Sequence, residues 1–143
     1  APPPAAANVV LLDAATINVY QGCDGVVVCY DPCRRETFDY AVRLVKTVSK
    51  DTPVLLVAGF RDRVRPDAVR VKRSEAEKLA ASRPLGCFLQ ASCKDLFGLD
   101  EVRRFFQIPF LVMKQRYAGK QLKHCREQLG QTRERLDAYG DTL

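Results

Sequence analysis

The feature that most constrains the fold of this chain is the run from Pro53 to Asp62. Five consecutive apolar residues, Val54 to Ala58, lie between two residues that interrupt regular structure, Pro53 and Gly59. The run is too short for an isolated helix and is typical of a strand buried on both faces of a parallel sheet. Functional side chains of such a sheet follow the carboxyl ends of its strands, here at Gly59 to Asp62.

Two further apolar runs predict strands of the same sheet. Gly25 to Tyr30 lies between Asp-Gly and Asp-Pro breakers, and the weaker run Leu85 to Ala91 leads into a Ser-Cys-Lys loop. Upstream, Val9 to Tyr20 fits either a strand or a short helix, and we favour a helix over Val9 to Gln21.

Amphipathic segments between these strands predict helices. A helix from Arg35 to Lys50 is indicated by apolar residues at three-to-four spacing, namely Phe38, Ala41, Val42, Val45 and Val48. After a polar loop from Arg63 to Lys72, a second helix is predicted over Ser74 to Ala81, with Ser74 as N-cap and Glu77 as its capping-box partner. Alternating strands and helices imply right-handed crossovers and a three-layer α/β fold, with helices flanking a parallel sheet.

The C-terminal third is predicted to be helical. One apolar face begins at Leu99 and includes Val102, Phe105 and Phe106, and Pro109 is expected to kink or interrupt the helix. The aromatic cluster of Phe105, Phe106 and Phe110 is expected to pack against the sheet.

Beyond the proline, the chain shows the spacing of a short coiled coil. Apolar and small residues alternate at intervals of three and four, at Leu122, Cys125, Leu129, Thr132 and Leu136. Gly119 and Gly130 each cost about 1 kcal/mol of helix stability relative to alanine. We therefore expect the tail helix from Lys114 to Tyr139 to need a protein partner.

The chain divides into three segments. Residues 1–8 are a proline- and alanine-rich linker or disordered segment, residues 9–112 form the α/β domain, and residues 113–143 form a basic helical tail. From Lys114 onward, seven basic minus four acidic residues gives +3 of the total charge of +6. Such a face suits nucleic acid, an acidic membrane or an acidic partner, although a solvated helix face is the simplest interpretation.

Composition argues against several classes of protein. No apolar run approaches the roughly 20 residues of a membrane span, and the N-terminal apolar segment lacks the basic flank of a signal peptide. The six cysteines form no CxxC pair, and His124 is the one histidine, so neither a metal site nor a disulfide framework is expected. Reduced thiols favour a cytoplasmic location, and Cys29 and Cys87 are expected to fill the core.

Polar residues follow the ends of two predicted strands. Asp62 follows the central strand, and Ser92-Cys93-Lys94 follows the third. A carboxylate can accept two N–H groups from a guanine edge, and a backbone N–H of the small loop can donate to the guanine carbonyl. This edge of the sheet is therefore a candidate pocket for a flat polar ring.

Over about Val9 to Phe110, the sequence resembles the Ras superfamily of small GTPases. Asp24 to Asp31, followed by Glu36-Thr37-Phe38, is similar to the fourth strand and third helix of a Rab-type G domain. Phe60-Arg61-Asp62 lies where that family has its Asn-Lys-x-Asp guanine motif, and Ser92-Cys93-Lys94 lies where it has Ser-Ala-Lys. The resemblance implies that these two segments contact the base.

A narrower resemblance is to the Rab-like protein six group. It is carried by Phe105 to Leu111, Phe-Phe-Gln-Ile-Pro-Phe-Leu, and by Leu12-Asp13-Ala14, Val19-Tyr20 and Phe97-Gly98-Leu99. That group has a divergent G domain followed by a long extension. The resemblance implies a partial P-loop G-domain fold, with strands equivalent to the last three and a long C-terminal helix.

The guanine motif is altered in this chain. Gly59 stands where the family has asparagine and Phe60 where it has lysine, and of the three motif positions only Asp62 is kept. No G-x-x-x-x-G-K-[ST] sequence occurs, so no phosphate cradle is expected. The Asp-x-x-Gly spacings at Asp95 and Asp137 follow the guanine loops and are not expected to be switch motifs.

These features favour a Rab-like pseudo-GTPase that acts as a structural or interaction module. The alternative is a GTP-binding switch whose phosphate-binding half lies outside this chain, so that GTP or GDP binds only when that half is supplied. A receiver-like α/β domain would need an acidic cluster at its first strand, which is not found.

The strand Gly25 to Tyr30 is expected to be covered by an upstream part of the polypeptide or by a protein partner, because exposed apolar edges recruit other strands. There is no strong case for nucleic acid. A large cytoskeletal, ciliary or nuclear assembly is compatible with a cytoplasmic location.

Overall fold

A computed structural model describes residues 19–142 of the chain. The predicted linker over residues 1–8 lies outside the described residues, as does most of the predicted helix from Val9 to Gln21. Residues 19–22 form a turn that leads toward the first strand.

The centre of the fold is a parallel sheet of three strands in the order β1-β2-β3. The strands are β1 (Val26–Tyr30), β2 (Val54–Ala58) and β3 (Gly86–Gln90). All five residues of β2 are buried, as its unbroken apolar run predicts. β1 lies at one edge of the described sheet, and only alternate residues of it are buried.

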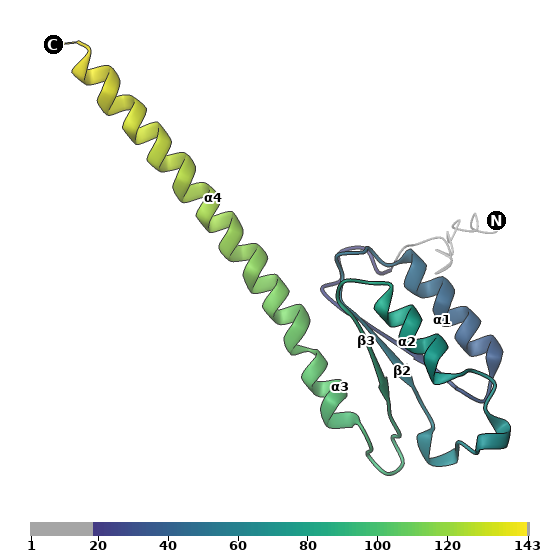
Figure 1. The fold of residues 1–143 in the computed structure, drawn as a ribbon. Helices are drawn as coiled ribbons and strands as arrows, with labels where there is room; N and C mark the ends of the chain where they lie inside the picture. The colour runs from purple at the N-terminus through teal and green to yellow at the C-terminus, as the bar shows by residue number, and fades with distance from the viewer. Residues whose placement is uncertain (1–18, 143) are drawn as a thin grey trace, which may run out of the picture.

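Helices cover both faces of the sheet and produce three layers (Figure 1). One face carries α1 (Arg35–Thr47) and α2 (Arg73–Ala81), while α3 (Leu99–Phe105) and the first turn of α4 (Gln107–Gly140) lie on the other. The loop between β2 and α2 contains two short 3₁₀ helices, η1 (Arg61–Arg63) and η2 (Pro66–Ala68). This arrangement confirms the predicted α/β fold with flanking helices and a long C-terminal helix.

The larger core lies between the sheet and α1. Phe38, Ala41 and Val45 of α1 are buried against the inward-facing residues of β1. The rings of Tyr30 and Phe38 meet edge to face with centroids 5.0 Å apart, a favoured aromatic geometry. The three-to-four spacing of the α1 residues therefore marks its buried face.

A smaller core lies on the opposite face. Leu55 and Val57 of β2 pack with Phe105, and Leu99 and Val102 of α3 are half-buried beside them. The start of α4 is held against the sheet by Pro109, which is buried and packs closely on Gly25. A side chain at Gly25 would displace this proline.

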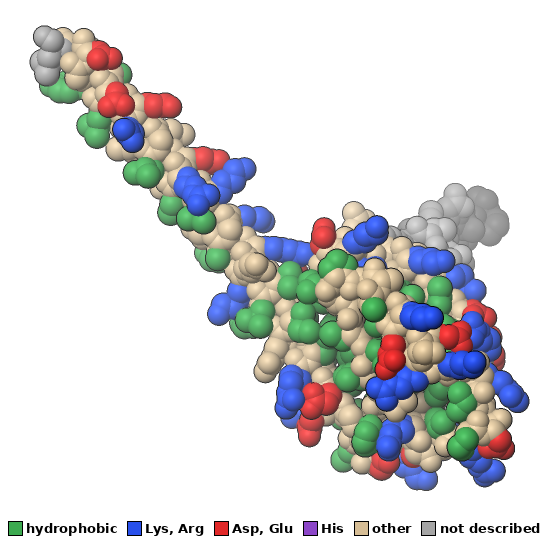
Figure 2. All heavy atoms as spheres, in the orientation of Figure 1, with side chains coloured by type: hydrophobic (Ala, Val, Ile, Leu, Met, Phe, Trp, Pro, Cys, Tyr) green, Lys and Arg blue, Asp and Glu red, His purple; other side chains and the backbone are tan. Residues whose placement is uncertain are grey.

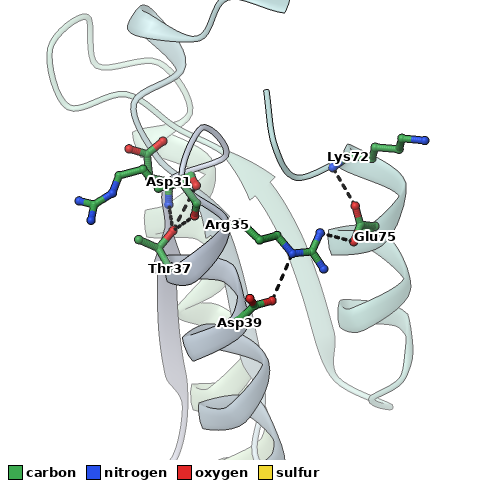
Figure 3. Close-up of polar contacts among 7 residues, drawn as sticks. Asp31, Arg35, Thr37, Asp39, Lys72 and Glu75 are labelled. Carbon is green, nitrogen blue, oxygen red and sulfur yellow. Dashed lines mark hydrogen bonds and ion pairs between the residues drawn. The ribbon is translucent and has the colours of Figure 1, made fainter. Parts of the chain in front are cut away.

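Polar contacts fix α1 to its neighbours (Figure 3). The backbone N–H of Asp31 donates to Thr37 Oγ1 at 2.9 Å, and the Thr37 hydroxyl donates to the Arg34 carbonyl at 2.7 Å. Arg35 joins the two helices of this face, because its guanidinium lies 3.2 Å from Asp39 and 2.7 Å from Glu75 of α2. These contacts hold the end of β1, α1 and α2 together.

The predicted capping box of α2 is wrong. Ser74 lies inside the helix, and the backbone N–H of Lys72 donates to Glu75 Oε1 at 3.1 Å. Lysine has no acceptor to complete the reciprocal bond, so only one arm of the motif forms. Glu75 occupies the third helical position because α2 begins at Arg73, and its other carboxylate oxygen pairs with Arg35.

Several predictions about the core are also wrong. Phe105 is buried, but Phe106 and Phe110 are 57% and 53% exposed. A helix turns by about 100° per residue, so each of these two side chains lies off the face that buries Phe105 and Pro109. Pro109 does interrupt the helix as predicted, although the break lies upstream at Phe106. Cys29 is exposed rather than core, because β1 is covered on one face only. The prediction for Cys87 is borne out in part, since Cys87 is half-buried and packs against the smaller core.

The rest of α4 extends away from the domain (Figure 1). Apart from the half-buried Val112, every described residue from Phe110 onward is exposed. Arg116 supplies one polar contact back to the domain, through a hydrogen bond of 3.1 Å to the Asp51 carbonyl. The described helices include none that is long and apolar enough to cross a lipid bilayer.

Candidate functional site

The candidate site is a pocket of about 640 Å³ at the carboxyl ends of the strands. Four of the six residues predicted from the sequence line it: Phe60, Asp62, Cys93 and Lys94. Its floor is apolar and is formed by Val27, Cys29, Val57, Ala91, Leu99 and Val102. An apolar floor with a few polar groups at the rim is the usual form of a small-molecule pocket.

Asp62 and Ser92 are in direct contact. The hydroxyl of Ser92 donates to Asp62 Oδ1 at 2.8 Å, and Ser92 is fully buried beneath the loop that carries it. The same hydroxyl oxygen accepts from the backbone N–H of Lys94 at 3.3 Å. This serine ties the loop after β2 to the loop after β3, because parallel strands bring their carboxyl ends to one edge.

The loop after β3 is folded on itself. The backbone N–H of Ser92 donates to the Phe97 carbonyl at 3.0 Å, and that of Phe97 donates to Asp95 Oδ1 at 3.1 Å. The second bond is the main cause that lowers the pKa of the Asp95 carboxyl. Gly98 closes the loop with φ of 75°, where a Cβ would clash with the Gln90 carbonyl. Cys93 and Lys94 are therefore presented from an ordered turn.

Phe60 adopts a left-handed backbone conformation, with φ of 58° and ψ of 28°. An aromatic residue is rare in this region. Its half-exposed ring lies beneath the Arg63 guanidinium, whose central carbon is 4.4 Å from the ring centroid. Phe60 thus offers an apolar surface where the Ras-type motif has a lysine.

Arg61 is not grouped with the other predicted residues. Its guanidinium stacks over the ring of Phe97, with 3.7 Å between the central carbon and the ring centroid. It lines a separate pocket of about 430 Å³ between β2, β3 and the loop before α2. Of the six predicted residues, four therefore line the first pocket, Arg61 lines the second, and the buried Ser92 lines neither.

The sequence analysis did not identify Val27 and Cys29 as pocket residues, but both line one side of the pocket. Val27 is 36% exposed and Cys29 is exposed, because no described element packs on this face of β1. Partial burial, and secondarily the neighbouring Cys93, raises the pKa of the Cys29 thiol. The period-two burial of β1 shows that one of its faces is uncovered, but its sequence of Val-Val-Val-Cys-Tyr shows no alternation in polarity.

The polar groups at the rim of this pocket are suited to hydrogen bonding with a bound molecule. Asp62 supplies an acceptor, Lys94 a donor, and the floor a flat apolar surface. Within residues 19–142, no group of three or more His, Cys, Asp or Glu side chains is placed to hold a metal ion. The arrangement suits a planar ring with a polar edge.

The described chain has three parallel strands between helical layers, polar loops at the carboxyl ends and a long final helix, an arrangement consistent with part of a Ras-like G-domain fold. Comparison with curated proteins indicates the same class of protein, the Ras-related small GTPases. No model of a known protein family matches it.

Rab-like protein 6 of Bos taurus and of Homo sapiens are each 30% identical to this chain over 145 residues, which cover 98% of this chain and 20% of each relative. Ras-related protein Rab-12 of Mus musculus is 31% identical over 94 residues, covering 63% of this chain and 38% of the relative. The chain is therefore a distant relative of the Ras-superfamily small GTPases. It spans about one fifth of the length of the Rab-like protein 6 relatives.

Proposed function

We propose that this chain is a Rab-related interaction module that does not bind GTP tightly by itself. The observation that carries the proposal is the uncovered side of β1, where Val27 and Cys29 expose apolar surface beside an open strand edge. An edge of this kind pairs readily with a strand from another segment or protein. The exposed α4 provides a second surface for a protein partner.

The lack of phosphate-binding groups supports this proposal. In P-loop proteins, backbone N–H groups, a lysine and Mg²⁺ hold the phosphates of the nucleotide. The chain has no sequence of that type. The pocket at Asp62 and Lys94 offers polar groups for a base, whereas the described residues include no P-loop to hold the triphosphate.

A titration with a fluorescent GTP analogue tests the proposal. The purified chain is expected to show no magnesium-dependent binding below micromolar concentrations, whereas an intact Rab-type GTPase serves as the positive control. Sub-micromolar binding that needs Mg²⁺ would show that the chain is a nucleotide switch and not a pseudo-GTPase.

The second candidate function, a GTP switch completed by a phosphate-binding half, is favoured by the bond between Ser92 and Asp62. This bond holds an acceptor carboxylate in place at the pocket. Guanosine, which has no phosphates, isolates the contribution of the base. If a base site is present, NMR should show weak guanosine binding at Asp62 and Lys94 that Asp62→Ala removes; equal shifts with adenosine, or none, would argue against it.

A cytoplasmic location, within a larger cytoskeletal, ciliary or nuclear assembly, forms part of the proposal. It is supported by the free thiols of the described cysteines. Immunoprecipitation of the chain from cytoplasmic and nuclear fractions, compared with Val27→Lys as an edge-blocked control, would test it.

A further inference from the structure

The exposed part of α4 carries an apolar stripe that no described residue covers. We call this stripe the tail seam. It comprises six residues spaced alternately three and four apart: Leu122, Cys125, Leu129, Thr132, Leu136 and Tyr139. All six are exposed, and Leu129 is 71% exposed. This spacing keeps one stripe facing a second helix wound around the first.

The positions that border the tail seam carry positive charge or none. In the heptad frame of the seam, these bordering residues are Gln121, Arg126, Gln128, Arg133, Arg135 and Gly140. The acidic residues of the same helix all lie away from the border: Glu127, Glu134 and Asp137. Figure 2 shows apolar side chains following one another along the tail, which also carries basic and acidic side chains on its surface. Bordering charges decide which helix can pair and in which orientation.

A second copy of the chain is a poor occupant of the seam. In a parallel pair, Arg126 would face Gln121, Arg133 would face Gln128, and no opposite charges would meet. Two copies would also gather all their bordering arginines along one narrow interface. Such a pair gains no attraction between bordering charges, whereas a helix with acidic bordering residues does.

We propose that the tail seam binds an α-helix with glutamate or aspartate at the positions bordering its own apolar stripe. This inference rests on the proposed interaction role and names the class of partner. Burial of Leu122, Leu129 and Leu136 supplies the affinity, while Arg126 and Arg133 pair with the acidic border and reject basic helices. From Leu122 to Tyr139 the seam is about 25 Å long, so a partner helix of about 20 residues covers it.

Two synthetic helical peptides provide the test. They share one apolar stripe and differ only in the bordering residues, which are all glutamate in one and all lysine in the other. Fluorescence anisotropy with the full chain should show the acidic peptide binding at least about tenfold more tightly, with an advantage that shrinks as salt is raised. Binding of neither peptide, or equal binding of both, overturns the proposal.

Matched charge reversals test whether the bordering arginines cause the preference for the acidic peptide. Arg126→Glu with Arg133→Glu changes the border, whereas Lys120→Glu with Lys123→Glu makes the same change in net charge away from it. After circular dichroism confirms that both variants keep their helix, the first should prefer the basic peptide and the second should keep the acidic preference. The same shift in both variants would show that bulk charge decides and would overturn the proposal.

Self-association is the remaining outcome. Sedimentation equilibrium should find the chain monomeric at micromolar concentration, and a dimer abolished by Leu129→Asp would assign the seam to a second copy. The nucleotide titration tests the proposed interaction module without involving the tail seam. A negative peptide result would therefore overturn the proposal about the tail seam and leave the titration result unchanged.

Discussion

At the scale of single residues, Arg83 has the most consequential place in the fold. It is a buried arginine, 8% exposed, in the turn between α2 and β3. Its guanidinium donates to the carbonyls of Val45 at 2.9 Å, Val48 at 3.1 Å and Thr52 at 3.3 Å, and also to the Ser49 carbonyl. These are backbone acceptors at the C-terminal end of α1 and in the turn that follows, where a cation is also favoured by the helix dipole.

Replacement of Arg83 should destabilise the domain strongly. Arg83→Met leaves several carbonyls without a donor, and we expect a loss of about 3 kcal/mol in the free energy of unfolding. Arg103→Met, at an exposed arginine of α3, is the matched control and should change it by less than about 0.5 kcal/mol. Urea unfolding followed by circular dichroism measures both. Similar losses would mean that the Arg83 bonds contribute little.

Tyr30 makes stability depend on pH in the alkaline range. Its side chain is buried, and this burial, with a smaller contribution from Glu75, raises its pKa to about 12. Between about pH 10 and pH 12 the unfolded chain loses this proton while the folded chain keeps it, so the free energy of unfolding falls there.

In the Tyr30→Phe variant, the free energy of unfolding should fall less between about pH 10 and pH 12. In the Tyr40→Phe variant the free energy of unfolding should fall as in the unmodified chain, because Tyr40 is exposed and its replacement changes no buried group. Urea unfolding from neutral pH to pH 12 gives the slope for each protein. Equal slopes in the unmodified chain and in Tyr30→Phe would show that the Tyr30 phenol has the same pKa in the folded and the unfolded chain.

At the scale of elements, α4 is a long helix with little packing to support it. Most helical stability in proteins comes from tertiary contacts, and beyond Val112 the described helix is exposed throughout. Gly119 and Gly130 lower it further, and a Cβ added at either would meet no neighbouring atom. The tail should therefore open locally well before the domain unfolds.

Alanine at these two glycines should strengthen the tail. Each of Gly119→Ala and Gly130→Ala is expected to add about 1 kcal/mol of helix stability and to slow amide exchange nearby about fivefold. Gly22→Ala is the contrasting control, since Gly22 has φ of 81° and alanine would be strained there. Hydrogen exchange by mass spectrometry on the full chain measures both effects. Unchanged exchange in the tail would contradict the assignment of the glycines as its weak points.

At the scale of the whole molecule, β1 is an open boundary of the described sheet. The Val26 backbone N–H donates to the Pro53 carbonyl at 2.9 Å, and the Gly59 N–H donates to the Tyr30 carbonyl at 2.9 Å. Because a parallel strand alternates the direction of its backbone groups, those of Val27 and Cys29 point to the other side. A free edge of this kind invites pairing with another strand.

The open edge predicts alternating amide exchange along β1. In the isolated chain, the amides of Val27 and Cys29 should exchange at least about tenfold faster than those of Val26 and Val28. Binding of an upstream segment or a partner to the edge should slow the fast pair selectively. Residue-resolved NMR exchange provides the measurement, and equal protection of all four amides in a monomeric chain would show that the edge is already paired.

Much of the fold follows from local patterns in the sequence. The three strands lie within one residue of the predicted runs at their ends, because apolar runs between Pro, Gly and Asp have few alternatives to a buried strand. The proximity of Asp62 to Ser92 follows from the same patterns, since parallel strands deliver their carboxyl ends to one edge. The identity of any ligand at that edge does not follow from them.

Local patterns in the sequence are enough to predict the order of strands and helices and the spacing of the tail seam, because each depends on neighbours a few residues away. Tertiary structure alone decided that Cys29 is exposed, that Phe106 and Phe110 leave the core, and that Arg83 is buried among carbonyls from another element. The physical reason is that burial depends on which element covers which face. That is set by contacts between residues more than 30 positions apart, as between Arg83 and Val45, and no local periodicity encodes them.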